Sequence, residues 1–431
     1  MLDRTIPPQP GPLVHRPLPA FEHTGLNNGI PVFLLPYGTV EMAEVQVVFK
    51  AGKAFQSKVG LASYTARMLS EGTEQYTSQQ LAERLDEHGS WIHHDMGAEF
   101  VAVNLTSLVE DLPNTLPFLA EVLMKPTFPE EEFTKLMQRS MQSLQVQQEK
   151  TAPIARRTFG HKLYGESHPY GMNLGPDELA LLKLDDLKAY YQSNLQSGNC
   201  FITVTGRFDR KVIMEQLESV FADWTWKDAP NISSNADIIP LGEQGFVHVH
   251  REGPQSTVRV GHLGVGRNDP DYYGLEVLTT ALGGYFGSRL MKNIREEKGY
   301  TYGIYGAWAA NRNYGHFVAQ ADVANEYVED TLAQIKLEMK RLQDKPLEAQ
   351  ELALLQNYML GKGLRARETP FQLSETLRHS LVYGIPFAEM DRGFEVIQHI
   401  TADEIRDLAQ KHFKPDDMLE VVVGGEQKTD S

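Results

Sequence analysis

The feature that most constrains this chain is an internal repeat at a fixed spacing. Residues 184–206 (LDDLKAYYQSNLQSGNCFITVTG) and 400–425 (ITADEIRDLAQKHFKPDDMLEVVVGG) share one pattern: an acidic helix start, an amphipathic helix, a polar turn and an apolar strand that ends at Gly. Two copies are too few for a solenoid, so we predict two similar domains. The equivalent residues lie 218 positions apart without a gap: Asp186 and Glu404, Leu187 and Ile405, Leu195 and Phe413, Val204 and Val422, Gly206 and Gly424.

A second correspondence supports the duplication. Residues 100–123 and 317–342 each read as a strand, a turn and a helix, and an acidic pair precedes each helix, where it favours the positive end of the helix dipole. Residues 89–106 (GSWIHHDMGAEFVAVNLT) are typical of a β-hairpin. We therefore predict an α+β fold of two homologous domains, each a mainly antiparallel sheet with helices packed on one face.

The boundary between the halves is predicted from composition. Residues 227–240 (KDAPNISSNADIIP) are rich in Asn, Ser, Asp and Pro and lack periodicity, which is typical of a linker. The predicted organisation is an N-terminal domain at 1–226, a linker at 227–240 and a C-terminal domain at 241–431.

Bulk properties narrow the class of function. The net charge of −16 argues against nucleic-acid binding and suits a solvated protein that attracts basic peptides. No apolar run approaches the ~20 residues that span a bilayer. The only cysteine, Cys200, excludes an internal disulfide and lies in an apolar segment. The N-terminus lacks the apolar core of a signal peptide, which favours the cytoplasm, although a periplasmic protein with its leader removed would look the same.

Residues 60–73 (GLASYTARMLSEGT) predict a helix that Gly60 opens and Gly72 caps. Ser63 and Arg67 are four residues apart and share a face, with Ala66 beside them. An inverted zinc motif, H-x-x-E-H, would need two imidazoles and a general base at these positions. A Ser hydroxyl is a poor zinc ligand, Arg has no lone pair to give and repels a dication, and Ala moves no proton. Taken alone, these residues favour an ordinary amphipathic helix whose Arg67 faces solvent.

The frame of this helix, G-L-A-x5-M-L-x-x-G-T, resembles the active-site helix of the M16 peptidases, the insulinase and mitochondrial processing peptidase family. The resemblance places the family's two histidines at Ser63 and Arg67 and its glutamate at Ala66. It also implies a third ligand, a Glu, within residues 138–148, where no carboxylate occurs between Glu132 and Glu149. HPYG (168–171) with GPDEL (175–179) resembles another stretch of the family. We expect no catalytic zinc, and no other cofactor, in this chain.

Residues 282–306 (LGGYFGSRLMKNIREEKGYTYGIYG) resemble the family's second-domain signature. A helix is predicted to end at Lys298 with Gly299 as its cap, and a strand to begin in YTYGIYG, which brings Arg295 and Tyr302 onto neighbouring elements. The resemblance implies that these two side chains hold the substrate carbonyl and stabilise the developing oxyanion. The alternative is a surface Arg295 paired with an acid such as Glu296, and a Tyr302 buried in the sheet.

Other candidate groups are weaker. Adjacent His93 and His94 would face opposite sides of a strand, whereas His248 and His250 share a face and could chelate a metal, although no third ligand has a suitable spacing. The Gly-rich stretch 283–287 (GGYFG) predicts a hinge or a loop at the lip of a substrate site.

Taken with the resemblance, these residues predict the non-catalytic subunit of a heterodimeric M16B metallopeptidase. Such a subunit would lack peptidase activity alone. It would supply Arg295 and Tyr302 to a zinc-bearing partner that cleaves peptides. Two alternatives stay open: a scaffold or peptide-binding protein without peptidase activity, and an active enzyme whose ligands have moved, for example to His248 and His250.

Overall fold

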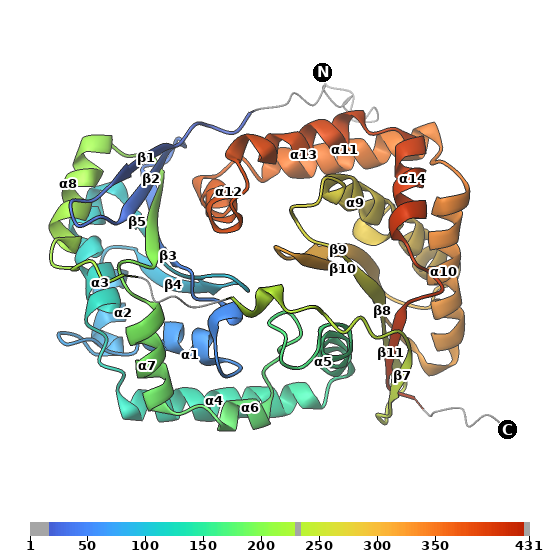
Figure 1. Cartoon of the computed structure of the whole chain (residues 1–431), viewed down its shortest axis with the longest axis horizontal. Helices are drawn as coiled ribbons and strands as arrows, with labels where there is room; N and C mark the ends of the chain where they lie inside the picture. The colour runs from blue at the N-terminus through green and yellow to red at the C-terminus, as the bar shows by residue number, and fades with distance from the viewer. Residues whose placement is uncertain (1–16, 229–233, 426–431) are drawn as a thin grey trace, which may run out of the picture.

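The computed structural model describes residues 17–228 and 234–425 and contains two sheets (Figure 1). The strand orders are β1-β2-β6-β3-β5-β4 and β7-β11-β8-β10-β9. The strands of the first sheet are β1 (Glu22–Gly25), β2 (Pro31–Pro36), β3 (Met42–Phe49), β4 (Trp91–Met96), β5 (Val101–Leu108) and β6 (Cys200–Gly206). Those of the second are β7 (Gly245–Val249), β8 (Gln255–Val265), β9 (Ile304–Ala310), β10 (Tyr314–Ala324) and β11 (Leu419–Val423).

The predicted duplication is confirmed at the level of topology. In each sheet one parallel pair, β2 with β6 or β7 with β11, is followed by three antiparallel pairs in the same order. The repeated helices α7 (Leu184–Asn194) and α14 (Ala402–His412) also begin and end 218 residues apart. The predicted α+β class with mainly antiparallel sheets is therefore correct, and β4 and β5 form the predicted hairpin.

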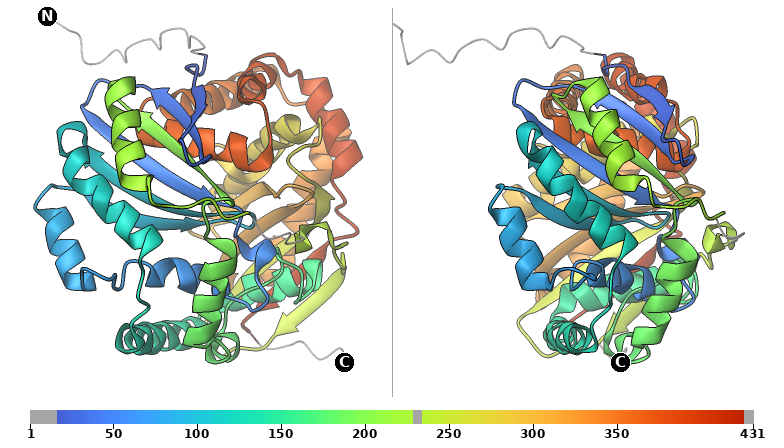
Figure 2. Two further views of the ribbon diagram at one scale, coloured as in Figure 1. Left: turned by 60° about the vertical axis from the view of Figure 1, so that its left-hand side comes forward. Right: turned by 90° about the vertical axis from the view of Figure 1, so that its left-hand side faces the viewer.

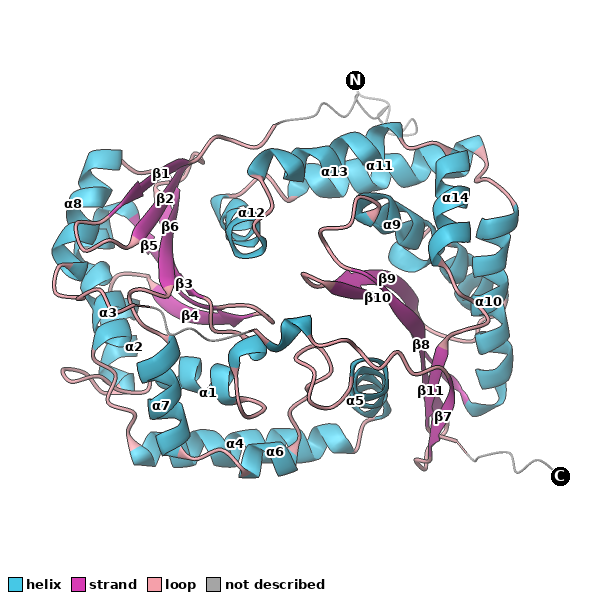
Figure 3. Ribbon diagram, in the orientation of Figure 1, coloured by secondary structure: helices cyan, strands magenta, loops and turns pink. Residues whose placement is uncertain are grey.

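Helices flank both sheets (Figure 3). Those of the first half are α1 (Leu61–Met68), α2 (Ser78–Asp86), α3 (Leu112–Met124), α4 (Glu130–Gln148), α5 (Thr151–Tyr164), α6 (Pro176–Ala180), α7 and α8 (Arg210–Phe221). Those of the second half are α9 (Tyr272–Thr279), α10 (Val328–Asp344), α11 (Ala349–Arg365), α12 (Pro370–Tyr383), α13 (Phe387–His399) and α14. Among the described residues no helix is both long and apolar enough to cross a membrane.

Each half has its own apolar core on one face of its sheet. Alternate residues of a strand point to opposite faces, so Val45, Val47 and Phe49 of β3 all enter the first core, together with residues of α3, α7 and α8. In the second half, Phe317 and Ala319 of β10 meet α9, α10 and α14 in the same way. Rotated views show α2, α3 and α8 covering the outer face of the first sheet (Figure 2). Cys200 is buried on β6, as predicted.

The opposite face of each sheet receives a helix from the other half of the chain. Helix α5 packs on β8 and β11, where Phe159 and Leu163 join Leu419 and Val421 in a small core. Helix α12 packs on β3 and β6 of the first sheet. The prediction of helices on one face of each sheet is thus correct for the two main cores. The exchange of α5 and α12 adds a partial helical layer on the other face of each sheet.

The two halves lie side by side with their sheets apart, joined along one edge by α4 to α6 and along the other by α11 to α13 (Figure 1). The 3-10 turn η3 (Asn235–Asp237) lies within the predicted linker 227–240, of which residues 229–233 lie outside the described residues, and β7 begins after the linker, at Gly245. The proposed domain limits at 226 and 241 remain predictions.

Candidate functional site

Helix α1 is held against the first core. Gly60 opens it with a φ of +88°, a left-handed conformation that suits Gly, and its backbone carbonyl accepts from the N–H of Tyr64. Tyr64 and Met68 are buried. The helix ends at Met68, shorter than predicted. Gly72 does not cap it and instead forms an isolated bridge with Thr77, so that prediction was wrong.

The three positions of the zinc motif carry no metal-binding chemistry. The Ser63 hydroxyl donates to the Gly60 carbonyl at 3.0 Å. Ala66 is only 2% exposed and belongs to the core. Arg67 is exposed, and its guanidinium carbon lies 5.2 Å from the centroid of the Tyr64 ring. Ser63 is thus a weak ligand that is already hydrogen-bonded, Ala66 offers only a methyl group, and Arg67 carries a fixed positive charge. These residues do not fit a zinc ion.

The region expected to supply a third ligand is helical, as predicted. Helix α4 begins at Glu130, and residues 133–148 of that helix contain no carboxylate. Across residues 17–228 and 234–425, no three His, Cys, Asp or Glu side chains gather closely enough to hold a metal ion.

Three of the histidine candidates, His248, His250 and His94, bond to protein atoms, whereas the buried Nδ1 of His93 has no hydrogen-bond partner among the described residues. His248 and His250 lie with ring centroids 6.4 Å apart, and they bond to the carbonyls of Gly424 and Gly425 at 2.7 and 2.6 Å. His94 bonds through Nε2 to the Ser70 hydroxyl at 3.3 Å, and burial lowers its pKa to about 4.

Arg295 lies in the π-helix η5 (Met291–Glu297), whose C-cap is Lys298 and which is followed by Gly299 at a φ of +69°. Its guanidinium carbon is 4.6 Å from the centroid of the Phe286 ring, and Phe286 is 63% exposed. The Gly-rich stretch 283–287 thus presents an aromatic face to Arg295, a contact that the sequence did not reveal because cation–π pairs have no fixed spacing.

Tyr302 stands in the loop before β9, because that strand begins at Ile304, within the predicted stretch YTYGIYG. It is 94% exposed, so the alternative of a tyrosine buried in the sheet is wrong. Thr301 holds the turn around it: its hydroxyl donates to the Gly303 carbonyl at 2.9 Å and accepts from the Gly303 N–H at 3.2 Å.

The base of this loop is anchored by residues that sequence reasoning missed. The carboxylate of Asp330 accepts hydrogen bonds from Lys298 and from the Tyr300 hydroxyl, both at 2.9 Å. Together with a bond from Gln334, these contacts lower the pKa of Asp330 to about 2. The Tyr300 ring also stacks on Tyr327 at 4.1 Å. The anchored base fixes where the exposed Tyr302 projects.

The HPYG stretch joins the first half to the linker. His168 is buried, its Nε2 donates to the Ile238 carbonyl at 2.9 Å, and its Nδ1 accepts from the N–H of Tyr170. Burial lowers the pKa of His168, in keeping with this neutral tautomer. The Tyr170 hydroxyl donates to the buried carboxylate of Glu99 at 2.7 Å. The observed role of this stretch is therefore structural.

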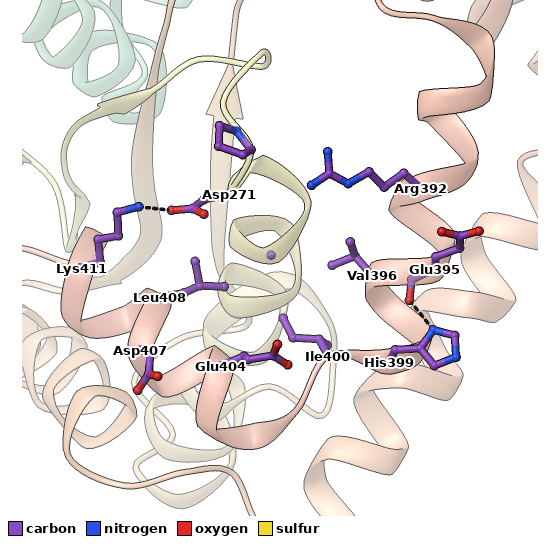
Figure 4. Close-up of a pocket in the computed structure, with 12 residues that line it drawn as sticks. Asp271, Arg392, Glu395, Val396, His399, Ile400, Glu404, Asp407, Leu408 and Lys411 are labelled. Atoms are coloured by element: carbon purple, nitrogen blue, oxygen red, sulfur yellow. Dashed lines mark hydrogen bonds and ion pairs between the residues drawn. The ribbon is translucent and has the colours of Figure 1, made fainter.

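A separate cavity of about 590 Å³ lies between α9, α13 and α14 (Figure 4). Gly274, Val396, Ile400 and Leu408 form its apolar wall, and charged side chains, including Asp271 paired with Lys411 at 2.5 Å, surround it. None of the candidate residues on α1 or around Arg295 lines it.

The fold and the site define a class: a duplicated α+β protein with the helix frame of a metallopeptidase but, in residues 17–228 and 234–425, no cluster of metal ligands. Two family models match the chain, "Insulinase (Peptidase family M16)" over residues 32–168 and "Peptidase M16 inactive domain" over residues 182–359. Together they cover most of its length. The chain belongs to the peptidase M16 family.

Individual relatives agree with this assignment. An "uncharacterized zinc protease" of Rickettsia felis is 24% identical, covering 91% of this chain and 95% of its own. A "non-peptidase homolog" of Helicobacter pylori is 22% identical, with 95% of each chain covered. A solved peptidase M16 inactive domain from Pseudomonas fluorescens has a TM-score of 0.86 at 22% identity, covering 94% of this chain and 98% of that one. The recognition of the family from sequence motifs is thereby confirmed.

Proposed function

We propose that this protein is the non-catalytic subunit of a heterodimeric zinc metallopeptidase. The observation that carries the proposal is the state of helix α1: Ser63, Ala66 and Arg67 occupy the family's metal and base positions and fit neither role. To take part in zinc-dependent hydrolysis, a chain with this helix would need a second subunit that brings the zinc. In this proposal the hydrolysis takes place at the zinc of the partner subunit, and no step takes place at a metal on α1 of this chain.

The contribution of this chain would come from Arg295 and Tyr302. An exposed tyrosine on an anchored loop can donate a hydrogen bond from a defined position, and a guanidinium supplies a charged pair of donors. In this proposal both groups bind the substrate carbonyl and stabilise the oxyanion that develops on it. The Phe286 ring supports the guanidinium.

The substrate would bind as an extended peptide along a sheet edge. Strand β4 is the last strand of the first sheet, so one side of its backbone has no partner strand there. It also contacts α1, and the bond between His94 and Ser70 links β4 to the turn that follows α1. A peptide added to β4 would be recognised mainly through its backbone and less through its side chains, which would give broad specificity.

A second candidate is a scaffold or peptide-binding protein with no role in peptide cleavage. The relative from Helicobacter pylori favours this alternative, because it is described as a non-peptidase homolog. Retention of Arg295 and of an exposed Tyr302 favours the heterodimer.

Co-expression with a zinc-bearing M16 chain from the same organism tests the proposal. We expect the two chains to co-purify and to cleave unstructured peptides only together. Replacing both Arg295 and Tyr302 should then abolish most turnover without breaking the complex. A stable complex whose turnover is unchanged by these replacements would contradict the catalytic role of the pair and favour the scaffold role.

A further inference from the structure

The duplication leaves one strand of the second sheet less covered than its counterpart in the first. Strand β2 pairs in parallel with β6, and β7 pairs in the same way with β11. Val204 of β6 matches Val422 of β11 at the spacing of 218 residues. Val204 pairs with Leu34, and Val422 pairs with His248. Strand β2 therefore corresponds to β7, with Leu34 at the position of His248.

In the first half this strand is covered on its edge and on its outer face. Strand β1 pairs with β2 along its edge in the antiparallel direction. Val32 and Leu34 are buried in the same core as residues of α8. Helix α8 is also tied to β1, because Arg210 donates to the Glu22 carboxylate at 2.7 Å. Both β1 and α8 thus close the space around β2.

Strand β7 has neither cover among the described residues. It is the first strand of its sheet, so one edge has no partner strand, and no helix follows β11 in that part of the chain (Figure 1). Phe246, which corresponds to Val32, is 58% exposed. Its ring stacks on that of the partly buried His248, with centroids 6.5 Å apart. The second half therefore has an open strand edge with an exposed aromatic side chain on it.

The backbone of β7 can form further hydrogen bonds at this edge. The N–H of Gly245 donates to the carbonyl just before β11, and the carbonyl of Val249 accepts from the N–H just after it. Alternate residues of a strand direct their N–H and C=O groups to opposite sides. Those of Phe246 and His248 therefore point away from β11, where no described strand pairs with them.

The sequence of β7 does not protect the edge. Exposed edge strands often carry a charged residue or a proline that discourages pairing with another chain. The edge strands β1 and β4 contain Glu22 and Asp95, whereas β7 (GFVHV) contains no Pro, Asp, Glu, Lys or Arg. The other edge of the second sheet, β9, also lacks these residues, but it lies beside the loop that carries Tyr302.

A strand of this kind is complementary to a copy of itself. In an antiparallel pair about a two-fold axis, the outward groups of Phe246 in one copy meet those of His248 in the other, and the reverse. The two Phe246 side chains lie on the same face of the joined sheet. No carboxylate, ammonium or guanidinium of β7 is brought against a like charge, since the strand contains none.

We propose that β7 is an interface strand through which two copies of this chain associate. Antiparallel pairing of β7 with β7 would join the two second sheets across a two-fold axis, and the occupant of the open edge is a second copy. The inference is independent of the proposed function, because neither Arg295 nor Tyr302 lies on β7.

Sedimentation of the purified full chain over a range of concentrations tests the interface, and we expect a reversible dimer. Phe246→Lys places two like charges at one interface, so the dimer dissociation constant should rise at least tenfold. Phe246→Pro removes the outward N–H but no bond to β11, as an edge strand tolerates, and should act similarly. Val212→Lys on α8, at a position 48% exposed, is the matched control and should leave the dimer unchanged.

Hydrogen exchange locates the contact. In the dimer the amides of Phe246 and His248 should exchange at least tenfold more slowly than in the dilute monomer, whereas those of residues 22–25 on β1 should not change. A chain that stays monomeric at every concentration, or a dimer equally stable in Phe246→Lys, would overturn the proposal. Association that requires a zinc-bearing M16 subunit and is lost in Phe246→Lys would assign the edge to that subunit and overturn the second copy as its occupant.

Discussion

The Arg378 guanidinium of α12 donates a hydrogen bond to the Asp95 carboxylate of β4 at 2.9 Å, across 283 residues of sequence. The Arg378 side chain is 5% exposed, and its guanidinium carbon also lies 4.8 Å from the centroid of the Phe100 ring. This pair fastens the exchanged helix α12 to the edge strand of the other half.

Replacing Arg378 by Met should therefore loosen the two halves. The change removes a buried cation and leaves Asp95 with only the Asn104 amide as a hydrogen-bond donor among the described residues, so we expect a loss of about 2–3 kcal/mol in the free energy of unfolding, measured in urea. Arg84→Met is the control. Arg84 forms a solvent-exposed pair with Glu87. Its loss should cost less than about 1 kcal/mol. Equal effects of the two substitutions would contradict the role of Arg378.

Helix α1 should resist restoration of the family's general base. Ala66→Glu places a carboxylate in a position that is 2% exposed and packed in the core. We expect a loss of roughly 2–4 kcal/mol in the free energy of unfolding, because the added group is both overpacked and desolvated. Arg67→His, at the exposed position of the same helix, should change stability by less than about 0.5 kcal/mol. Tolerance of the glutamate would show that this part of the core has space for it.

Stability should fall as the pH drops from 6.5 to about 4. His262 is buried on β8, its Nδ1 donates to the Leu263 carbonyl, and burial lowers its pKa from 6.5 to about 4. Above pH 6.5 the ring is neutral in both states. Below that pH the unfolded chain takes up a proton that the folded chain does not, so folding is disfavoured by roughly 3 kcal/mol by pH 4.

The slope of stability against pH isolates this residue. In the His262→Gln variant it should be smaller than in the wild type by about 1.4 kcal/mol per pH unit between pH 6 and 4.5, which is one proton. Denaturant unfolding at several pH values provides both slopes. Parallel slopes for the two proteins would rule out His262 as the titrating group.

In the reconstituted heterodimer, Tyr302→Phe and Arg295→Lys should each lower turnover by roughly 10²–10³-fold, as expected for loss of an oxyanion donor. Affinity between the subunits should not change. Tyr76→Phe and Arg84→Lys are matched controls on the first half and should leave turnover unaltered. Turnover assays with a peptide substrate, together with sedimentation of the complex, separate catalysis from assembly.

Local sequence was sufficient for the elements and for the duplication. The spacing of 218 residues places α7 and α14 correctly, since helix starts and strand ends follow from nearby acids and glycines such as Gly206 and Gly424. The exchange of α5 and α12 could not be predicted in the same way, because an apolar helix face does not specify which sheet it will meet.

The same distinction applies to the candidate site: features local in sequence could be predicted, and features that depend on distant contacts could not. Ser63, Ala66 and Arg67 share one helical turn, so their pattern was readable. The anchoring of the Tyr302 loop by Asp330 depends on contacts with residues that are distant in sequence from Asp330, namely Lys298 and Tyr300.

The most direct test of the account is the metal content and peptidase activity of the isolated chain. After dialysis, elemental analysis should find no stoichiometric zinc, and an unstructured peptide should remain uncut whether or not zinc is added. Cleavage should appear only when a zinc-bearing M16 subunit is present. Tightly bound zinc in the chain alone, with cleavage that a chelator abolishes, would contradict the claim that its catalytic site is supplied by a partner.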